Sequence, residues 1–341
     1  MIIKDIKIEE YQKSFVSKTY FGQELFESRK GWYLKIITDS GVTGIGEASP
    51  IPFISKENHL EAGYALDGFK IALKDIDYDT SIEELLLLSD VHGLGNPSSK
   101  FAIQSAVYDI ASQIENKTIS QFLNLNSINK VNINSLYHKN CTVSANKTEV
   151  LKIKIHSNNI YDIKESIEKK LTKFPSDIKL RIDFNGCLDL VRAIRICKSL
   201  ECYNIDYLEQ PLPIGSMEDL YELRTCTNIP VAVDESLIDY ESAEKLISES
   251  AADVFVVKPT LLGGYDDMKK MVDLCDKEGI RLILTSSFET KIAQLFILHL
   301  IASFNIVEHC GVFNVKLFQD ESIVEIINSQ CMLPEKTGLS I

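Results

Sequence analysis

Apolar runs of strand length alternate with amphipathic stretches through the second half of the chain. The runs lie near residues 131–136, 150–155, 178–183, 205–209, 230–234, 253–258, 280–285 and 305–308. Most of the intervals between them carry apolar residues at helical spacing, as in 187–202 and 265–278. Eight strands that alternate with helices predict an α/β fold, a (β/α)8-type barrel of the modified TIM kind.

Two units of this predicted barrel depart from the pattern. The segment between the first and second runs is short and has little helical character, so we expect one outer helix to be shortened or absent there. No long helical pattern follows the eighth run, so we expect the chain to leave the barrel at that point.

The first part of the chain is organised differently. Residues 2–11 and 31–38 have strand character, and 39–41 is typical of a hairpin turn. Helical patterns follow at about 56–75, 80–90 and 99–116. Strands first and helices after predict a separate α+β domain. The chain therefore divides into an N-terminal α+β domain (1–125), the barrel (126–315) and a C-terminal segment that returns to the first domain (316–341).

Composition narrows the classes of partner. The chain has 341 residues, of which 45% are hydrophobic and 25% charged, enough for one large barrel with an accessory domain. Its 36 basic and 49 acidic side chains give a net charge of −13, and they include no block of lysines or arginines. This balance argues against nucleic acid and anionic membrane as partners. A carboxylate ligand would need cations supplied within its own site.

Two segments bear on the location of the protein. The N-terminus lacks the basic-then-apolar pattern of a secretion signal, so we expect a cytoplasmic protein. The longest uncharged stretch, 292–307, has 16 residues and falls short of the ~20 that cross a bilayer. It predicts a buried helix.

Five charged residues each close one of the apolar runs. They recur at intervals of about 25 residues, the length of one strand-and-helix unit, and are Lys154, Asp183, Glu209, Asp234 and Lys258. Charges at successive strand ends of a parallel barrel converge on one mouth, where barrel active sites lie. The pattern therefore predicts a polar site with three carboxylates between two lysines.

The residue types suggest a chemistry for this site. Three carboxylates without an accompanying His or Cys favour Mg²⁺, or Mn²⁺ as a substitute, over zinc. Burial and a nearby cation would lower the pKa of Lys258, so that a neutral amine could act as a base. A structural salt bridge from Lys258 to one of the carboxylates is the open alternative. Lys152 lies two residues before Lys154 and therefore faces the same side of its strand.

These residues sit in motifs that resemble the enolase superfamily, specifically its muconate-lactonizing branch. The motifs cover nearly the whole chain and are 44–50 (GIGEASP), Lys152-x-Lys154, 183–185 (DFN), 208–211 (LEQP), 233–236 (VDES) and Lys258 with Gly263-Gly264. The resemblance implies that the N-terminal domain caps the barrel and that 44–50 is a loop of this capping domain. It also implies that Mg²⁺ on Asp183, Glu209 and Asp234 binds a substrate carboxylate.

The resemblance further implies roles for the lysines. One lysine removes the proton on the carbon next to the carboxylate, and the enediolate that forms is tolerable only beside a divalent cation and ammonium groups. By the match, Lys154 is the general base or acid on one face and Lys258 lies on the opposite face. Lys152 would help to neutralise the carboxylate, and Asn185 and Glu235 would support the metal ligands.

Residues 258–264 and 285–290 are similar to motifs of o-succinylbenzoate synthases within this branch. Such an enzyme is a lyase that dehydrates 2-succinyl-6-hydroxy-2,4-cyclohexadiene-1-carboxylate in menaquinone biosynthesis. Ser286 and Ser287, with Gly263 nearby, would then contact substrate, although a simple polar turn is the alternative for the serines. Phe288 and the stretch 310–313 depart from the synthase pattern.

Other functions on the same fold stay open. The Asp-x-Asp that dipeptide epimerases of the branch place on the eighth strand is missing from 307–311, which disfavours a substrate with an ammonium group. The rival interpretation is a cycloisomerase or racemase/epimerase acting on an N-acylamino acid, a dipeptide or muconate. A barrel that binds a metal or ligand without turnover is a third. Two minor hypotheses concern 20–22 as a lid and His156 as a structural histidine.

Overall fold

A long antiparallel hairpin begins the chain in this computed structural model, which describes residues 1–21, 24–74, 79–138, 141, 147–155, 157–321 and 324–339. Strand β1 (Ile3–Phe21) pairs with β2 (Glu24–Thr38), which pairs in turn with β3 (Thr43–Ala48). The turn predicted at 39–41 therefore connects β2 to β3. The segment 44–50, expected as a loop, is mostly strand β3.

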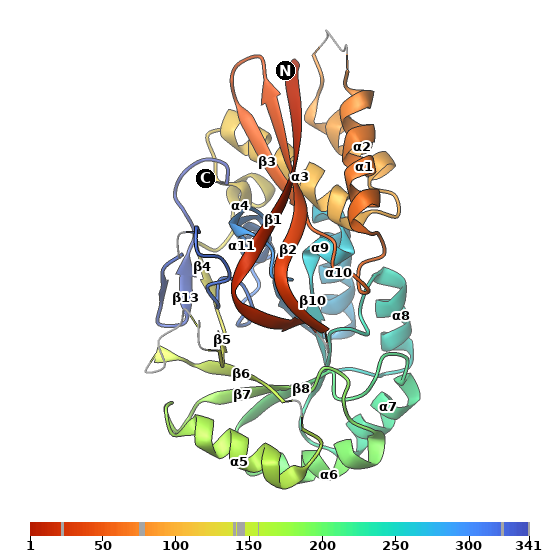
Figure 1. The fold of residues 1–341 in the computed structure, drawn as a ribbon, viewed down its shortest axis with the longest axis vertical. Coiled ribbons are helices and arrows are strands. Elements are labelled where there is room, and N and C mark those ends of the chain that lie inside the picture. The colour runs from red at the N-terminus through yellow and green to blue at the C-terminus, as the bar shows by residue number, and fades with distance from the viewer. Residues whose placement is uncertain are drawn as a thin grey trace.

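Helices pack on this sheet and complete an α+β domain (Figure 1). They are α1 (His59–Ala72), α2 (Ile82–His92), α3 (Pro97–Ile114) and the short α4 (Ile119–Leu123). The two glycines of β3 explain how closely α3 approaches: a Cβ added to Gly44 or Gly46 would lie 1.9 Å from the carbonyl oxygen of Ala106 or Ala102. Only glycine allows this contact between strand and helix.

A curled parallel sheet forms the second part of the molecule, below the first in Figure 1. In the described residues it has seven strands in the order β11-β10-β9-β8-β7-β6-β5. These are β5 (Ser135–Leu136), β6 (Val150–Lys154), β7 (Lys179–Asp183), β8 (Ile205–Glu209), β9 (Val231–Val233), β10 (Val254–Val257) and β11 (Arg281–Leu284).

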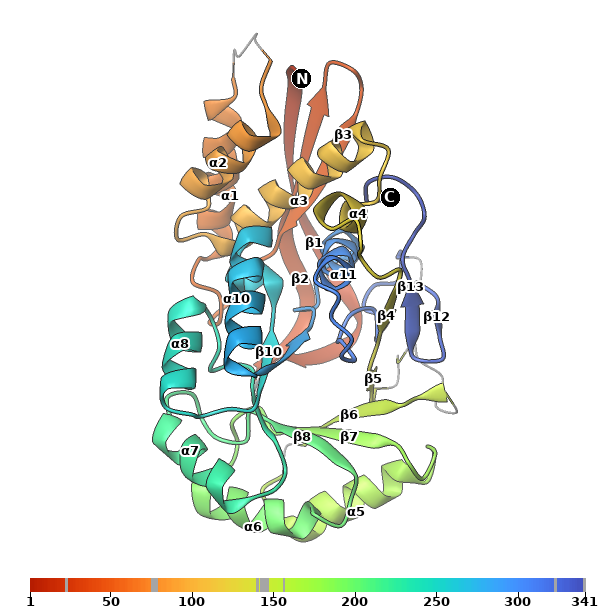
Figure 2. The ribbon, with the colours of Figure 1, turned by 180° about the vertical axis from the view of Figure 1, so that it is seen from behind.

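Helices follow the strands of this sheet from β6 onward. They are α5 (Ile160–Leu171), α6 (Leu190–Leu200), α7 (Met217–Cys226), α8 (Tyr240–Ser248), α9 (Pro259–Leu262), α10 (Tyr265–Glu278) and α11 (Lys291–Ser303). Figure 2 shows α5, α6, α7, α8 and α10 on the outside of the sheet. The uncharged stretch that begins at residue 292 is mostly the buried helix α11. In the described chain, no helix combines the length and the apolar character needed to cross a membrane.

The barrel closes through two residues instead of the eighth strand predicted at 305–308, and that prediction was wrong. Gly311 donates to the carbonyl of Leu284 on one side at 2.9 Å, and Cys310 donates to the carbonyl of Asn132 on the other at 2.8 Å. The apolar run itself could not pair, because Asn305 has a left-handed backbone (φ 54°) and Val307 is 73% exposed. The closing segment has no apolar run that would mark it as a strand.

The first predicted strand, 131–136, is split in two. Residues Lys130–Asn132 form β4, which joins a small antiparallel sheet with β12 (Ile326–Ile327) and β13 (Gln330–Met332), and only β5 enters the parallel sheet. Most of 139–149, where we expect a shortened outer helix, lies outside the described residues, and that expectation stays a prediction.

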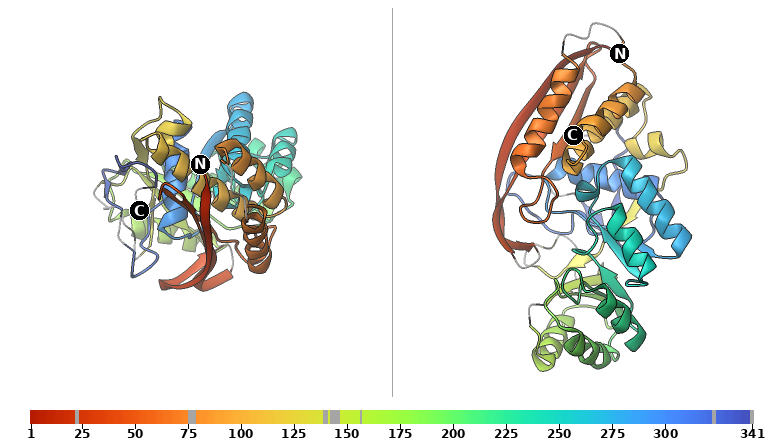
Figure 3. Two further views of the ribbon diagram at one scale, coloured as in Figure 1. Left: turned by 90° about the horizontal axis from the view of Figure 1, so that it is seen from above. Right: turned by 90° about the vertical axis from the view of Figure 1, so that its right-hand side faces the viewer.

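The C-terminal segment contacts both parts of the molecule. Leu317 accepts a hydrogen bond from the amide of Val16 in β1, and the amide of Leu339 donates to Asp109 in α3 at 2.9 Å. Between these contacts, β13 pairs with β4 next to the barrel. Figure 3 shows from the side how the N-terminal hairpin arches over the barrel.

A buried arginine fills the end of the barrel opposite the strand ends that carry the predicted site. Arg181 is 1% exposed, donates to Asp206 at 2.8 Å and to the carbonyl of His309 at 2.5 Å, and stacks 4.7 Å over the ring of Tyr207. Burial opposes a charge here, but Tyr207 and Asp206 outweigh it and raise the pKa of Arg181. The guanidinium is therefore a charged structural element of the barrel.

Replacing Arg181 by methionine tests this structural role. The R181M variant keeps most of the volume but leaves Asp206 with less compensation, so we expect it to lower the free energy of unfolding by about 3 kcal/mol. Chemical denaturation followed by circular dichroism measures this change. The exposed pair Lys269 and Asp273 on α10 supplies the control, because K269A is expected to cost at most about 0.5 kcal/mol. Equal losses in the two variants would contradict the role.

Candidate active site

Strand register brings the predicted site residues to one level of the barrel. Lys154 on β6 pairs with Asp183 on β7, and Asp183 pairs with Glu209 on β8. Asp234 follows directly after β9, and Lys258 follows directly after β10. Because parallel strands end at the same edge of a sheet, all five side chains meet at the carboxyl-terminal mouth.

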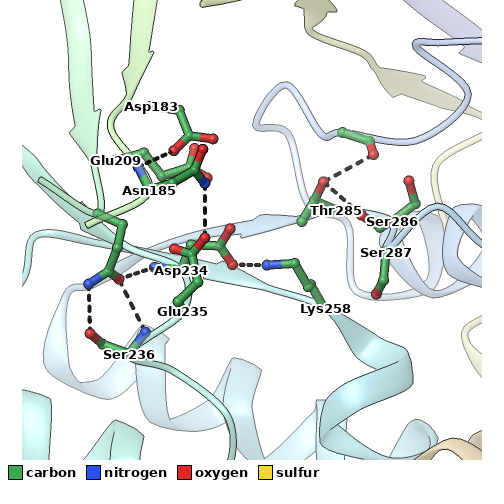
Figure 4. Close-up of polar contacts among 12 residues, drawn as sticks. Asp183, Asn185, Glu209, Asp234, Glu235, Ser236, Lys258, Thr285, Ser286 and Ser287 are labelled. Atoms are coloured by element: carbon green, nitrogen blue, oxygen red, sulfur yellow. Dashed lines mark hydrogen bonds and ion pairs between the residues drawn. The ribbon is translucent and has the colours of Figure 1, made fainter. Parts of the chain in front are cut away.

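The lysines lie against the row of carboxylates. Nζ of Lys152 is 2.5 Å from Glu209 Oε1 and 3.1 Å from Asp183 Oδ2, so this one ammonium bridges two carboxylates. Nζ of Lys154 lies 3.8 Å from the same Asp183 oxygen. At the other end of the row, Lys258 donates to Asp234 (Figure 4). Each carboxylate of the row therefore has a cation beside it.

Residues just beyond the strands fix the carboxylates in place. The amide of Asn185 donates to Asp183 Oδ1 at 3.0 Å, and its side chain donates to Glu235 Oε1 at 2.9 Å (Figure 4). Gln210 accepts hydrogen bonds from the amides of Asp234 and Ser236, both at 3.1 Å. Asn185 and Gln210 have positive φ values of 45° and 38°, which is uncommon outside glycine and concentrates at functional sites.

Burial and charge shift the ionisation of the whole cluster. Burial raises the pKa of Glu209, and burial together with the charge of Asp183 raises the pKa of Glu235 to about 7. Burial also disfavours the ionised form of Asp183, but Lys152 and Lys154 outweigh it and hold that pKa below its ordinary value. Burial lowers the pKa of Lys258 to about 7, although the charge of Glu209 opposes this shift. Ionisable groups with such opposed shifts are typical of functional sites.

The donor set fits a divalent cation. Its members are carboxylates, the hard oxygen ligands that Mg²⁺ prefers. In the described part of the chain, Glu209 Oε2 and Glu235 Oε2 are buried but accept no hydrogen bond, whereas Asp183 Oδ2 forms ion pairs with Lys152 and Lys154. Among all the residues that the structure describes, no group of three or more His, Cys, Asp and Glu side chains is already arranged to hold a metal ion. Lys152 and Lys258 instead bind the carboxylate oxygens that such an ion would take.

A pocket opens above this cluster. Its lining combines charged, amide, hydroxyl and apolar side chains: Asn134, Leu136, Lys152, Lys154, Asn185, Tyr207, Glu209, Asp234, Glu235, Val256, Lys258, Ile283, Thr285, Ser286, Phe288, Gly311 and Asn314. Asp183 lies beside it, fully buried. Eight of the eleven predicted residues thus line one cavity, and apart from Asp183 there are two exceptions.

Ser287 and Gly263 are those exceptions, because neither lines the pocket in the described structure. Ser287 is 1% exposed, and its hydroxyl lies 3.0 Å from that of Thr260, while Ser286 remains at the pocket (Figure 4). Adjacent residues of an extended segment point to opposite sides, so only one of the two serines can face the cavity. Gly263 faces α10, where an added Cβ would lie 2.3 Å from Asp267 Oδ2.

The sequence analysis missed several lining residues. Three of them lie two positions before the residue that ends or directly follows their strand, and these are Tyr207, Val256 and Ile283. Because side chains alternate along a strand, this spacing of two is a signal that points them into the barrel. Gly311 belongs to the closing segment and Asn314 follows it, and the apolar pattern did not show the position of that segment.

Phe288 forms one wall of the pocket from a strained backbone. Its φ is 62°, which is a genuine outlier for a bulky side chain. Its ring packs edge-on against Phe15 of β1, with 6.3 Å between the ring centroids. The N-terminal domain therefore contributes to the wall next to the site. Gly22 of the hypothetical lid and His156 lie outside the described residues.

Comparisons with known proteins agree with this fold and site. Residues 138–341 match the family described as Enolase C-terminal domain-like. The chain is 27% identical to the L-Ala-D/L-Glu epimerase of Clostridium acetobutylicum, over 100% of this chain and 99% of that protein. The o-succinylbenzoate synthase of Thermobifida fusca is 32% identical over 114 residues, which are 33% of this chain and 34% of that protein.

A solved structure shows the same fold. The dipeptide epimerase from Enterococcus faecalis, complexed with Mg and the dipeptide L-Leu-L-Tyr, has a TM-score of 0.86 at 22% identity and covers 99% of both chains. The predicted fold class, a capping α+β domain on a barrel-like parallel sheet, is thus confirmed.

The chain belongs to the enolase superfamily, in the mandelate racemase and muconate lactonizing group, and is an enzyme of that superfamily. One relative that matches over its full length is an epimerase, whereas the match to a synthase covers a third of the chain. This shifts the balance from the predicted lyase towards the isomerase alternative.

Proposed function

We propose that this protein moves a proton on the carbon next to a substrate carboxylate and thereby racemises or epimerises an amino acid derivative. The observation that carries the proposal is the placement of the two lysines. Lys154 and Lys258 lie on β6 and after β10, with the carboxylate-bearing strands β7, β8 and β9 between them. A substrate carbon held over this row has an amine on each side.

Two amines on opposite faces suit an isomerase. The amine on one face removes the proton as a neutral base, and the ammonium on the other face returns one with inverted configuration. Lys258 is 8% exposed, and burial favours its neutral form. A lyase that removes proton and hydroxide from the same face needs only one of these lysines for proton transfer.

Asp183, Glu209 and Asp234 would hold the magnesium ion. Bound there, Mg²⁺ would acidify the carbon next to the substrate carboxylate by neutralising the charge that develops on it. Lys152, buried against Asp183 and Glu209, adds a fixed positive charge at the same place. Asn185 and Gln210 keep the carboxylates oriented through the hydrogen bonds described above.

The pocket favours a substrate whose nitrogen carries no charge. Beyond Glu209, Asp234 and Glu235, which cluster beside the lysines, its described lining contains no acidic side chain that could bind an ammonium group. Near the closing segment it offers instead Asn134, Thr285 and Asn314, which bind neutral amides and carbonyls. An N-acylamino acid therefore fits better than a dipeptide with a free N-terminus.

Dehydration to o-succinylbenzoate is the second candidate. It is favoured by the same lack of a partner for an ammonium group and by the motifs at 258–264 and 285–290. Ser286 would offer its hydroxyl to the distal succinyl carboxylate. The lining lysines are the three at the carboxylate row, so that distal group would have hydrogen-bond donors but no cation of its own in the described pocket.

A substrate panel in D2O with Mg²⁺ separates these functions. We expect N-acylamino acids to exchange their α-proton for deuterium and to change configuration, because a lysine is available on each face. Proton NMR follows the exchange, and optical rotation follows the configuration. Aromatisation of the cyclohexadiene substrate without exchange into N-acylamino acids would establish the second candidate. Failure of every carboxylate to exchange or react would contradict both.

Single lysine variants test the role of each face. We expect K154A to lose α-proton exchange from one enantiomer and K258A to lose it from the other, each by at least about 1,000-fold, since each amine reaches one face. The same NMR experiment, run separately on the two enantiomers, measures this. The exposed Lys269 gives a matched control, and K269A is expected to exchange both enantiomers normally. Loss of both enantiomers' exchange in only one variant would contradict a two-base mechanism.

A further inference from the structure

A buried carboxylate of the N-terminal domain reaches into the barrel. Glu47, near the end of β3, is 0% exposed. It accepts hydrogen bonds from the hydroxyl of Tyr11 at 2.5 Å, the amide of Thr290 at 3.0 Å, the hydroxyl of Thr290 at 2.6 Å and the amide of Ala293 at 3.2 Å. Three of the four donors belong to the start of α11, more than 240 positions away in the chain.

Through these contacts, the Glu47 side chain caps the first turn of α11, a helix in the other domain. Thr290 occupies the capping position of α11, but among the described residues its own side chain does not cap the helix. The first amides of a helix lack partners within the helix and attract negative charge. Glu47 supplies both an acceptor and that charge, and the Thr290 hydroxyl binds Glu47 in return.

The start of α11 also determines the wall of the pocket. Thr285, Ser286 and Phe288 line the pocket within five residues of Thr290. The left-handed backbone of Phe288 costs about 1–3 kcal/mol, and such a conformation persists only where its surroundings fix it. Buried Glu289 fixes the backbone just before Phe288, because it accepts from the amide of Ser287 at 2.6 Å. Glu47 fixes the backbone just after Phe288 through its hydrogen bonds with Thr290.

We propose that Glu47 is a positioning residue, which fixes the start of α11 from the N-terminal domain and through it the pocket wall formed by Ser286 and Phe288. The part of this inference that concerns turnover rests on the proposed function. Glu47 does not line the pocket in the described structure and takes no part in proton transfer. Its loss therefore weakens the fit of substrate and leaves the lysines in place.

Hydrogen exchange of the free protein tests the anchor without any substrate. In E47Q the neutral side chain has one acceptor oxygen instead of two and keeps at most two of the four bonds, so we expect amides in a peptide spanning 288–294 to exchange at least about tenfold faster than in the wild type. A peptide from β8 should exchange unchanged. Mass spectrometry measures both. Wild-type exchange at 288–294 in E47Q would overturn the proposal.

Glu57 provides a matched control within the N-terminal domain. It is also buried, at 3% exposure, and accepts from the amide of Ser98 at the start of α3 at 2.7 Å. E57Q thus removes a comparable capping carboxylate from a helix of the N-terminal domain, without touching the bonds to Thr290 and Ala293. It should speed exchange near residue 98 and leave 288–294 protected. Faster exchange at 288–294 in E57Q as well would mean general loosening and would overturn the specific role of Glu47.

Kinetics with the substrate found in the panel distinguish positioning from general destabilisation. We expect E47Q to raise KM about tenfold while kcat stays within about threefold, because substrate fit changes and the lysines do not. E57Q should change neither. A fall in kcat at constant KM in E47Q would overturn the assignment.

Two further measurements apply if E47Q does not fold or if the wild type has no measurable turnover. If E47Q does not fold, T290V removes one bond to Glu47 and should shift exchange and KM in the same direction by a smaller factor. No shift in T290V would then count against the proposal. If the wild type turns over no substrate, the proposed function fails, and the exchange experiment alone decides whether Glu47 anchors α11.

Discussion

Three buried carboxylates at neighbouring strand ends are the constraint on which this structure depends. Their mutual repulsion in a poorly hydrated site would oppose the fold unless cations lay among them. Lys152 supplies that charge between Asp183 and Glu209, and Lys258 donates to Asp234. Lys258 and the neighbouring Lys154 also stand where proton transfer next to a substrate carboxylate needs them. The same arrangement of carboxylates and lysines thus stabilises the fold and supports the proposed chemistry. A divalent cation bound there would replace part of the positive charge that the lysines supply.

The N-terminal domain is the second determinant of the site. It does more than cover the barrel, because it supplies hydrogen-bond acceptors to two barrel helices. Glu47 caps α11, and Gln104 of α3 accepts from the amide of Tyr265 at the start of α10 at 2.7 Å. Each of these helices follows a segment that carries site residues, α11 after Ser286 and Phe288, and α10 after Lys258. The position of the N-terminal domain and the shape of the pocket are therefore mechanically linked.

The sequence predicted those features whose cause is local. A charge that ends an apolar strand can lie only at a barrel mouth, so Lys154, Asp183 and Glu209 could be placed together from the sequence. The closing segment could not be predicted, because Cys310 and Gly311 pair through single bridges that leave no apolar run. The contact of Glu47 with Thr290 joins residues far apart in the chain and has no local signal. The reaction was the least secure prediction, since short motifs pointed to a synthase while a relative that matches over its full length is an epimerase.

Metal binding at this site requires the carboxylates to release their lysines and take up a divalent cation. Crystals grown with Mn²⁺ and measured by anomalous diffraction at the manganese edge test this, because they locate the ion without reference to activity. We expect one strong anomalous peak at the carboxylate row, with oxygens of Asp183, Glu209 and Asp234 coordinating the ion and the ammonium of Lys258 moved away from Asp234. A peak at another place, or no peak while Lys152 and Lys258 keep their contacts with the carboxylates, would contradict it.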